Sequence, residues 1–422
     1  MRAHRCAVGA RRTAAAVCMA ASALLAPALR AQVEEPPEGL PAGPWILAPA
    51  LLAGYSGDSN VFYESPSMGP VSDPLRTASP SLRATLPFRN SRFDLAYRAT
   101  KSDYDEVVLA RSVSQEFGAT LSLVFSSYDR LEASASRTLG SSDTQVFDPG
   151  GEAVFRGLPY DFDEQTVGIS RRVQGKRGWD VYVTRSVLDY ADDPDATFFD
   201  YDGLEATALY REPLSPKMWL VADWTGRWFD EYDAADTDPD REPTWQERSK
   251  LFRAGLQGFL GTGRPYQVVV GLADFGLTGA STSTYRGWTA DGALVTRFGA
   301  ATSLEVRASR RPWPSFFLEG NFYVNEAASA RLERRWLRQS RLGAEGRWSR
   351  ATYTEPVPEG LAGEGIVRAD RTVRLRVYAN LMVHERFGIR LSVDDDRRTS
   401  NFEYAEYRKR VYFVGILLGW YE

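Results

Sequence analysis

Residues Arg408 to Glu422, R-K-R-V-Y-F-V-G-I-L-L-G-W-Y-E, form the stretch from which the fold can be inferred. The stretch combines β-branched and aromatic residues, which favour strands, with two glycines and no proline. We therefore expect the chain to finish on a strand. We expect this strand to close a transmembrane barrel by pairing with the first strand, which requires earlier strands of suitable number, length and spacing.

The composition favours one large all-β unit over several soluble domains. The chain has 422 residues, of which 12% are aromatic, and it contains 35 glycines. Its mean hydropathy is −0.35, and beyond the N-terminal region no stretch approaches the roughly 20 apolar residues of a membrane helix. The sequence therefore does not predict a helical membrane protein.

The first 31 residues have the features of an export signal. Four arginines precede an apolar run from Ala14 to Leu29, and the small residues Ala28 and Ala31 provide cleavage sites. A retained anchor helix fits poorly because the run is short and contains Pro27. We expect export by the general secretory route, followed by cleavage after Ala28 or Ala31.

Cysteine content and charge limit the class of protein. Cys6 and Cys18 both lie in the predicted signal, so the exported chain would have no disulfide and would need another source of stability. A closed ring of strand hydrogen bonds supplies one in lipid, where backbone groups must be paired. Without the five arginines of the signal, 46 basic residues (51 − 5) face 55 acidic ones, a net charge of −9. This balance argues against nucleic acid as a partner.

The mature chain divides into a leader and a long series of strands. Residues 32–44 are acidic and proline-rich, which predicts a short extended periplasmic leader. Residues 45–422 contain about 18 strand-like segments, mostly near the 9–11 residues that a tilted strand needs to cross a bilayer. We predict a single transmembrane antiparallel up-and-down β-barrel of about 18 strands, with about 16 as the next choice.

The connections between these segments alternate in length. Arg89–Ser91 and Ser126–Tyr128 are short, whereas Glu64–Ala78 and Gly140–Asp161 are long. Short turns on one side and long loops on the other are typical of outer-membrane barrels, at the periplasmic and exterior ends respectively. A propeller would show a repeat of its blades, and we find none.

Side chains alternate with period 2 in the clearest segments. Val373, Leu375 and Val377 share one face, and Arg374 and Arg376 share the other. This pattern indicates a lipid face and a water face. Aromatic residues near segment ends are expected to form two interface girdles, namely Trp45, Tyr55, Phe88, Phe93, Phe125, Trp179, Trp228, Phe298, Trp348 and Trp420.

One arginine conflicts with the alternation. Arg185 shares a face with Val181 and Val183. Pointing it at lipid would cost about 2–4 kcal/mol near the midplane. A β-bulge or a position at the membrane interface would resolve the conflict.

Two passages resemble a known family. The opening G-Y-S-G-D-S-N-V-F-Y (Gly54 to Tyr63) and the closing passage from Asp394 to Trp420 are similar to the first and last hairpins of β-barrel porins of Gram-negative outer membranes that are associated with exopolysaccharide or capsule clusters. The resemblance implies an outer-membrane barrel with a channel or polysaccharide-export role. It also implies contacts with outer-membrane lipid and lipopolysaccharide, the barrel-assembly machinery and polysaccharide-export components.

The inventory of reactive side chains argues against an enzyme. The mature chain has one histidine, His384, in a turn that the topology assigns to the periplasm. A hydrolase that depends on histidine and faces outward is therefore disfavoured. We expect no catalytic residues and no cofactor.

Acidic residues gather in two of the predicted exterior loops. The acidic outer mouth would comprise Asp192, Asp193, Asp195, Asp236, Asp238 and Asp240. Such a mouth would favour cations at the entrance. Asp236, Asp238, Asp240 and Glu247 also approach a calcium-loop spacing, but Arg241 stands where that loop needs glycine. A merely acidic loop is the better interpretation.

Charged residues are predicted to line the lumen as a ladder. Its members are Asp94, Arg98, Glu132, Glu305, Arg307, Glu345, Arg347, Arg374, Arg376 and Arg390. They could steer ions or sugars through a pore, as charged rings do in channels. They could equally form arginine–carboxylate pairs that brace the wall. The aromatic residues Tyr182, Trp219 and Tyr378 would also face inward.

The sequence leaves two functions open. The first is a porin-like channel for passive passage of small hydrophilic solutes, or a role in polysaccharide export. The second is a structural or adhesive surface barrel whose lumen is plugged by a loop such as Gly140–Asp161. The seam between first and last strands should be less polar inside than elsewhere, with Gly54 and Gly415 among its inward residues. We expect a loop or the leader to pack against it.

Overall fold

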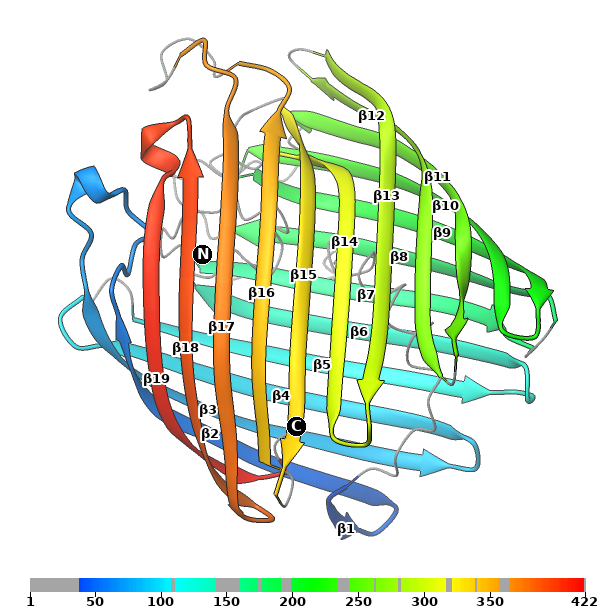
Figure 1. Ribbon diagram of the computed structural model, residues 1–422, viewed down its shortest axis with the longest axis horizontal. Helices are drawn as coiled ribbons and strands as arrows, with labels where there is room; N and C mark the ends of the chain where they lie inside the picture. Colours follow the sequence, from blue (N-terminus) through cyan, green and yellow to red (C-terminus); the bar gives the residue numbers. More distant parts are fainter. Residues whose placement is uncertain are drawn as a thin grey trace, which may run out of the picture.

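The chain forms one closed antiparallel barrel of eighteen strands, which confirms the predicted fold class (Figure 1). This computed structural model describes residues 38–107, 111–141, 159–173, 176–190, 199–233, 243–261, 263–279, 282–315, 321–337, 340–356 and 364–420. The barrel strands are β2 (Trp45–Asp58), β3 (Asp73–Phe88), β4 (Ser91–Tyr104), β5 (Ser112–Val124), β6 (Asp129–Ser141), β7 (Pro159–Arg171), β8 (Gly178–Tyr190), β9 (Phe199–Ser215), β10 (Met218–Asp233), β11 (Trp245–Leu260), β12 (Arg264–Gly279), β13 (Thr282–Phe298), β14 (Thr302–Pro314), β15 (Phe322–Trp336), β16 (Ser340–Tyr353), β17 (Ala369–His384), β18 (Phe387–Ser400) and β19 (Tyr407–Gly419). The predicted signal lies outside the described residues.

The last strand closes the barrel on the first, as predicted. β19 pairs antiparallel with β2 from Val411↔Asp58 to Gly419↔Ala50. Beyond the end of β19, a short strand of the leader, β1 (Leu40–Ala42), pairs with the start of β2. The start of β2, which β19 does not reach, is therefore paired with β1, at the end of the barrel where Figure 1 shows β1.

The strands are longer than the sequence suggested. They run from 13 to 17 residues, more than the 9–11 needed to cross a bilayer. The extra residues shorten several exterior loops; β12 and β13 already pair at Thr278↔Thr282. At the opposite end the turns are tight, and Gly299 between β13 and β14 has a positive φ of 68°, which glycine adopts without strain. No helix in the described part of the chain is long and apolar enough to cross a membrane.

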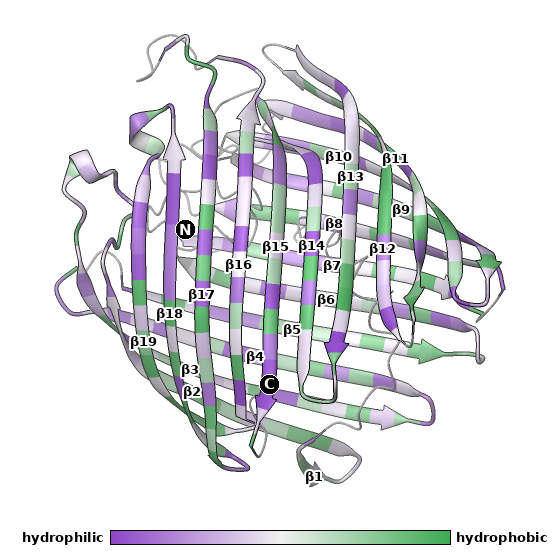
Figure 2. Cartoon of the chain, viewed as in Figure 1, coloured by the Kyte–Doolittle hydropathy of each residue, from purple (hydrophilic) through white to green (hydrophobic). Residues whose placement is uncertain are grey.

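The outward face carries an apolar band that ends in charge. Along β19, Tyr412, Val414 and Ile416 are 42–53% exposed and point away from the lumen, and Arg410 ends this row toward the long loops. In Figure 2 the upper parts of β18 and β19 are mainly hydrophilic and their lower parts mainly hydrophobic. A closed barrel with such an exposed band is suited to lipid.

The conflict at Arg185 is resolved by this boundary. Arg185 does point outward, and from this residue on the outward row of β8 is mixed, because Val187 and Asp189 follow it. It binds Asp202 of β9 through two nitrogens, at 3.1 and 2.6 Å. The pairing of β8 with both neighbours shows no β-bulge here, and the polar neighbours Gln165 and Asp202 fit the expected position at the membrane interface.

The inner side of the seam is filled by the barrel's own side chains. The Phe413 ring lies over two glycines, because a Cβ added to Gly54 or Gly415 would lie 2.5 Å from that ring. Leu417 beside them is only 2% exposed. The seam is apolar as predicted, and in the described residues an aromatic ring covers its glycines where we expected a loop or the leader.

Candidate functional site: the charged lumen

The ten residues of the predicted ladder all occupy inward-facing positions, since each alternates with exposed apolar neighbours on its strand. They do not form one ladder. Asp94 and Arg98 lie on β4, Glu132 on β6, and Glu305 and Arg307 on β14. The remaining five are adjacent on β16, β17 and β18, namely Glu345, Arg347, Arg374, Arg376 and Arg390.

The five residues on β16–β18 belong to a larger feature, which we call the arginine wall. It consists of the inward arginines of β15–β18 other than the buried Arg398, namely Arg331, Arg335, Arg341, Arg347, Arg374, Arg376 and Arg390. The inward carboxylates at the same levels are fewer, namely Glu333, Glu345, Asp394 and Asp396. This part of the lumen therefore has an excess of positive charge.

The arginine wall is paired but open to the lumen. Arg376 binds Asp394 and keeps 45% of its side chain exposed. Arg331 lies 3.0 Å from Glu333 and is 50% exposed. Exposed guanidinium groups remain available to a passing anion, and Arg can bind carboxylate or phosphate through two parallel hydrogen bonds.

Tyr378 lies within this wall but is already engaged. Its hydroxyl donates to Glu333 at 2.7 Å and accepts from Arg331 at 3.1 Å. Its ring covers Gly343 of β16, since a Cβ there would lie 2.1 Å from the ring. Tyr378 therefore positions the charged groups beside it and is not a free platform for sugars.

A second charged region was not predicted from the sequence. Arg253 of β11 binds Asp223 of β10 at 2.7 Å and also binds Asp291 of β13. Arg311 of β14 donates hydrogen bonds to the same Asp291 from Nε and Nη2, at 2.9 and 2.6 Å. The four side chains are 3–12% exposed, so this chain of ion pairs is shielded from water.

Arg227 of β10 extends the second region. It lies 3.2 Å from Glu247 and 3.6 Å from Glu205, and Ser249 donates to Glu247 at 2.7 Å. We call the whole set the buried network: Glu205, Asp223, Arg227, Glu247, Arg253, Asp291 and Arg311. The alternation of charged residues on β10 and β11 was the available sequence signal for this network. Aromatic residues such as Trp224 and Trp228 lie between the charged residues and make that alternation hard to recognise.

The end of β14 covers the buried network. β14 pairs with β13 only as far as Arg310↔Ala290, whereas its pairing with β15 continues to Pro314↔Phe322. Prolines cannot donate to a ladder and are found where a strand becomes an edge. The freed end carries Trp313, which lies 5.1 Å from the Arg227 guanidinium.

Aromatic packing holds this cover in place. Trp313 packs with Tyr323 of β15 and Tyr353 of β16 in a buried cluster. Phe322 packs against Phe275 and Leu277 of β12 in another. The long-loop end of the lumen is therefore filled on the β12–β16 side.

A third stretch of the lumen, β3–β6, is lined by small hydroxyl side chains. Its inward positions include Thr77, Ser79, Ser81, Thr100, Ser112, Ser114, Thr120, Ser122, Ser134, Ser136 and Thr138. Figure 1 shows these strands behind β15–β18. Small hydroxyls leave space and can hydrogen-bond a solute, so we call this region the hydroxyl wall.

The passage from Gly54 to Tyr63, which covers the end of the first strand and the residues after it, is bonded to the closing strand across the seam. Asn60 is fully buried; its amide donates to the carbonyls of Glu64 and Arg408 at 2.8 and 3.2 Å. Ser59 extends the β2–β19 ladder by donating its N–H to the Arg410 carbonyl at 3.0 Å. Val61 packs against Tyr104 of β4. The passage therefore fastens the first loop to the closing strand.

Several predicted site residues lie elsewhere. The six aspartates of the acidic outer mouth, and with them three of the calcium candidates, lie outside the described residues. Glu247, the fourth candidate, is buried in the network. The described residues contain no metal-binding group of three or more acidic, histidine or cysteine side chains. His384 ends β17 beside the tight turn to β18, where the topology placed it.

Comparisons with known proteins support the fold. No protein-family model and no curated protein matches the chain. Among solved structures, the FrpB iron transporter from Neisseria meningitidis matches with a TM-score of 0.50 and 9% identity over 86% of this chain and 63% of its own length. OpdO from Pseudomonas aeruginosa matches at 0.47 and 12% over 89% and 98%, and opdK from the same organism at 0.46 and 12% over 89% and 98%. At these identities the likeness concerns the barrel fold alone.

Proposed function

We propose that this protein is an outer-membrane channel for the passive passage of small hydrophilic solutes, exported by a cleaved signal. The observation that carries the proposal is the contrast inside the lumen. The arginine wall presents exposed and the hydroxyl wall half-exposed polar groups, whereas the buried network and its aromatic cover fill another sector. A polar path therefore runs beside exposed arginines, which attract solutes that bear carboxylate or phosphate groups.

Planar-bilayer recordings test the channel directly. Folded protein is expected to give discrete conductance steps, and the reversal potential in a salt gradient is expected to show a preference for anions set by the arginine wall. The acidic outer mouth predicted from the loops would oppose this preference at the entrance. Folded protein without steps would instead support the rival, a structural or adhesive barrel with a plugged lumen.

The role in polysaccharide export, with its export components as partners, rests on the resemblance of the two hairpins alone. An exported polysaccharide would have to enter the lumen and reduce the ionic current. Current blockade by anionic oligosaccharides, compared with neutral ones of equal length, would support this role. Equal, weak blockade by both would favour the small-solute channel.

A further inference from the structure

Charged residues form a belt on the outward face, at the long-loop border of the apolar band. Over most of the circumference the arginines of this belt, and Lys101, have carboxylate partners, whereas Lys250 of β11 lies opposite Asp274 without a close ion pair in the described residues. The ion pairs of the belt are Arg76–Asp105, Lys101–Asp103, Arg137–Asp161, Arg185–Asp202, Arg248–Asp230, Arg286–Asp274 and Arg310–Glu326. The belt is therefore close to neutral over these strands.

The belt changes character over β16–β19. Five outward arginines, Arg350, Arg371, Arg397, Arg408 and Arg410, gather there, and we call them the arginine patch. Asp395 is the acid among them, bound to Arg408 at 3.3 Å and Arg410 at 3.0 Å. The other three arginines have no ion-pair partner in the described part of the chain, and all five are exposed.

The register places like charges directly opposite one another in this patch. Arg350 of β16 faces Arg371 of β17 on one side, and on the other side it faces Glu326, which is already bound to Arg310. Arg397 of β18 faces Arg408 of β19. Like charges opposite one another destabilise a sheet. An anion between them would convert repulsion into paired attraction, and arginine suits phosphate in particular because its fork donates two hydrogen bonds.

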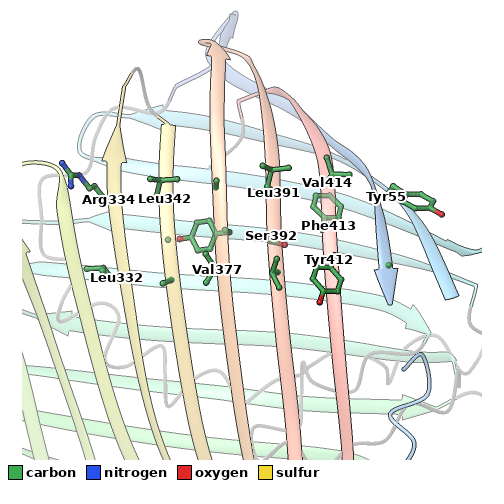
Figure 3. Close-up of a pocket in the computed structure, with 16 residues that line it drawn as sticks. Tyr55, Leu332, Arg334, Leu342, Val377, Leu391, Ser392, Tyr412, Phe413 and Val414 are labelled. Carbon is green, nitrogen blue, oxygen red and sulfur yellow. The ribbon is translucent and has the colours of Figure 1, made fainter. Parts of the chain in front are cut away.

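Two hollows lie on the same strands. The first lies at the patch and is lined by Trp348, Arg350, Arg371 and Thr399, among others. The second is apolar and lies nearer the short turns, where Leu342, Val377, Leu391 and Val414 line it together with Tyr55 across the seam (Figure 3). Along the strands of the outward face, a hollow suited to a charged head group is thus followed by a hollow suited to apolar chains.

The spacing of the two hollows suits a membrane lipid. On β17 Val377 lies six positions from Arg371, and on β18 Val393 lies four positions from Arg397. These intervals correspond to about 13–20 Å along the strand, comparable to one leaflet of a hydrocarbon core that is about 30 Å thick. A head bound at the patch would therefore place its acyl chains over the apolar hollow.

We propose that the arginine patch and the apolar hollow beside it bind a phosphorylated, multiply acylated glycolipid of the outer leaflet. The arginines hold its phosphate groups, and the outward side chains of β16–β19 hold its acyl chains. The site lies outside the lumen. It rests on the barrel being in an outer membrane and is independent of whether the barrel conducts.

Lipid binding by the folded full-length barrel tests the site. The triple variant Arg350→Gln, Arg371→Gln and Arg397→Gln is compared with a matched control of paired belt arginines, Arg185→Gln, Arg248→Gln and Arg286→Gln. The probes are phosphorylated lipid A, the same lipid A after phosphatase treatment, and inorganic phosphate. Heat-modifiable mobility in gels reports folding, and bilayer conductance reports the lumen.

The patch variant is expected to bind phosphorylated lipid A about tenfold more weakly than the unmodified protein, whereas the control variant binds it normally. Dephosphorylated lipid A should bind both proteins equally weakly. Conductance should be unchanged, which separates failure of this site from failure of the channel. Equal loss in patch and control variants, normal binding of dephosphorylated lipid, or full displacement of the lipid by millimolar inorganic phosphate would each overturn the proposal.

Discussion

The arginine wall and the buried network are built from the same kind of ion pair but lie in different surroundings. Arg376 in the wall is 45% exposed beside its carboxylate partner. Arg253 in the network is 5% exposed, between two carboxylates that are 3% and 5% exposed. Exposed pairs contribute little to stability and leave charge free for solutes. A buried arginine cannot be removed without stranding its partners. Burial therefore separates a wall whose charges can meet solutes from a network whose charges cannot.

The largest effect is expected where the buried network is broken. Arg253→Met leaves Asp223 and Asp291 with less compensation in a dry site and is expected to lower the free energy of unfolding by about 3–5 kcal/mol. Urea unfolding in lipid vesicles, followed by tryptophan fluorescence, measures it. Arg376→Met in the arginine wall is the control, with a loss under about 1 kcal/mol. Equal losses would remove the distinction between the two regions.

Removing the aromatic cover should expose the buried network to the lumen, as the arginine wall already is. Trp313→Ala uncovers Arg227 and deletes the ring that packs on Tyr323 and Tyr353. We expect a loss of about 3 kcal/mol in unfolding free energy, together with a larger single-channel conductance. Trp336→Ala is the control, since Trp336 is 51% exposed near the short turns. An unchanged conductance in a folded Trp313→Ala protein would mean that the cover does not narrow the path.

The arginine wall should act on selectivity and barely on stability. In the triple variant Arg331→Gln, Arg347→Gln and Arg376→Gln, each lost charge is worth about 0.5 kcal/mol at ~8 Å in water. Because each lost charge raises the energy of an anion and lowers that of a cation, the ratio of anion to cation permeability should fall at least about tenfold at low salt and less at high salt. Reversal potentials measure this ratio. The control is the triple Gln variant of Arg185, Arg248 and Arg286, which loses the same charge outside the lumen. A similar fall in the permeability ratio of this control would contradict the assignment of selectivity to the arginine wall.

The smallest difference is expected between two ion pairs of similar geometry but different burial. Arg185 and Arg311 each place Nη2 2.6 Å from an aspartate oxygen. The first pair is 42% and 40% exposed on the outward belt, whereas the second is 12% and 5% exposed in the network. Arg185→Gln is expected to cost under about 1 kcal/mol, and Arg311→Gln roughly threefold more. Equal costs in urea unfolding would show that pairing, and not burial, sets the contribution.

Much of the architecture could be predicted from the sequence. The period-2 alternation of β17, from Val373 to Leu381, assigns its two faces, and this pattern needs no knowledge of neighbours. The glycine and aromatic residues of β19 identify the closing strand, and tight turns such as the one after Phe88 fix the connectivity. The lengths of the strands were underestimated because their outer ends are polar on both faces.

The lumen was predicted less completely. Every member of the charged ladder faces inward, because parity along a strand decides that. The buried network escaped prediction because it joins residues far apart in sequence, such as Asp223 and Asp291 through Arg253. Its shielding depends on Trp313, whose strand leaves its neighbour only at the long-loop end.

The sequence by itself determined the class of barrel, the strand that closes it and which residues point into the lumen, because these follow from alternation and turn spacing, which are local properties. Only the tertiary structure decided which of the inward charges are buried and which remain open. Burial depends on how the wall curves and on what covers it. In this barrel the cover is the free end of β14, which lies over charges supplied by strands β9, β10, β11 and β13.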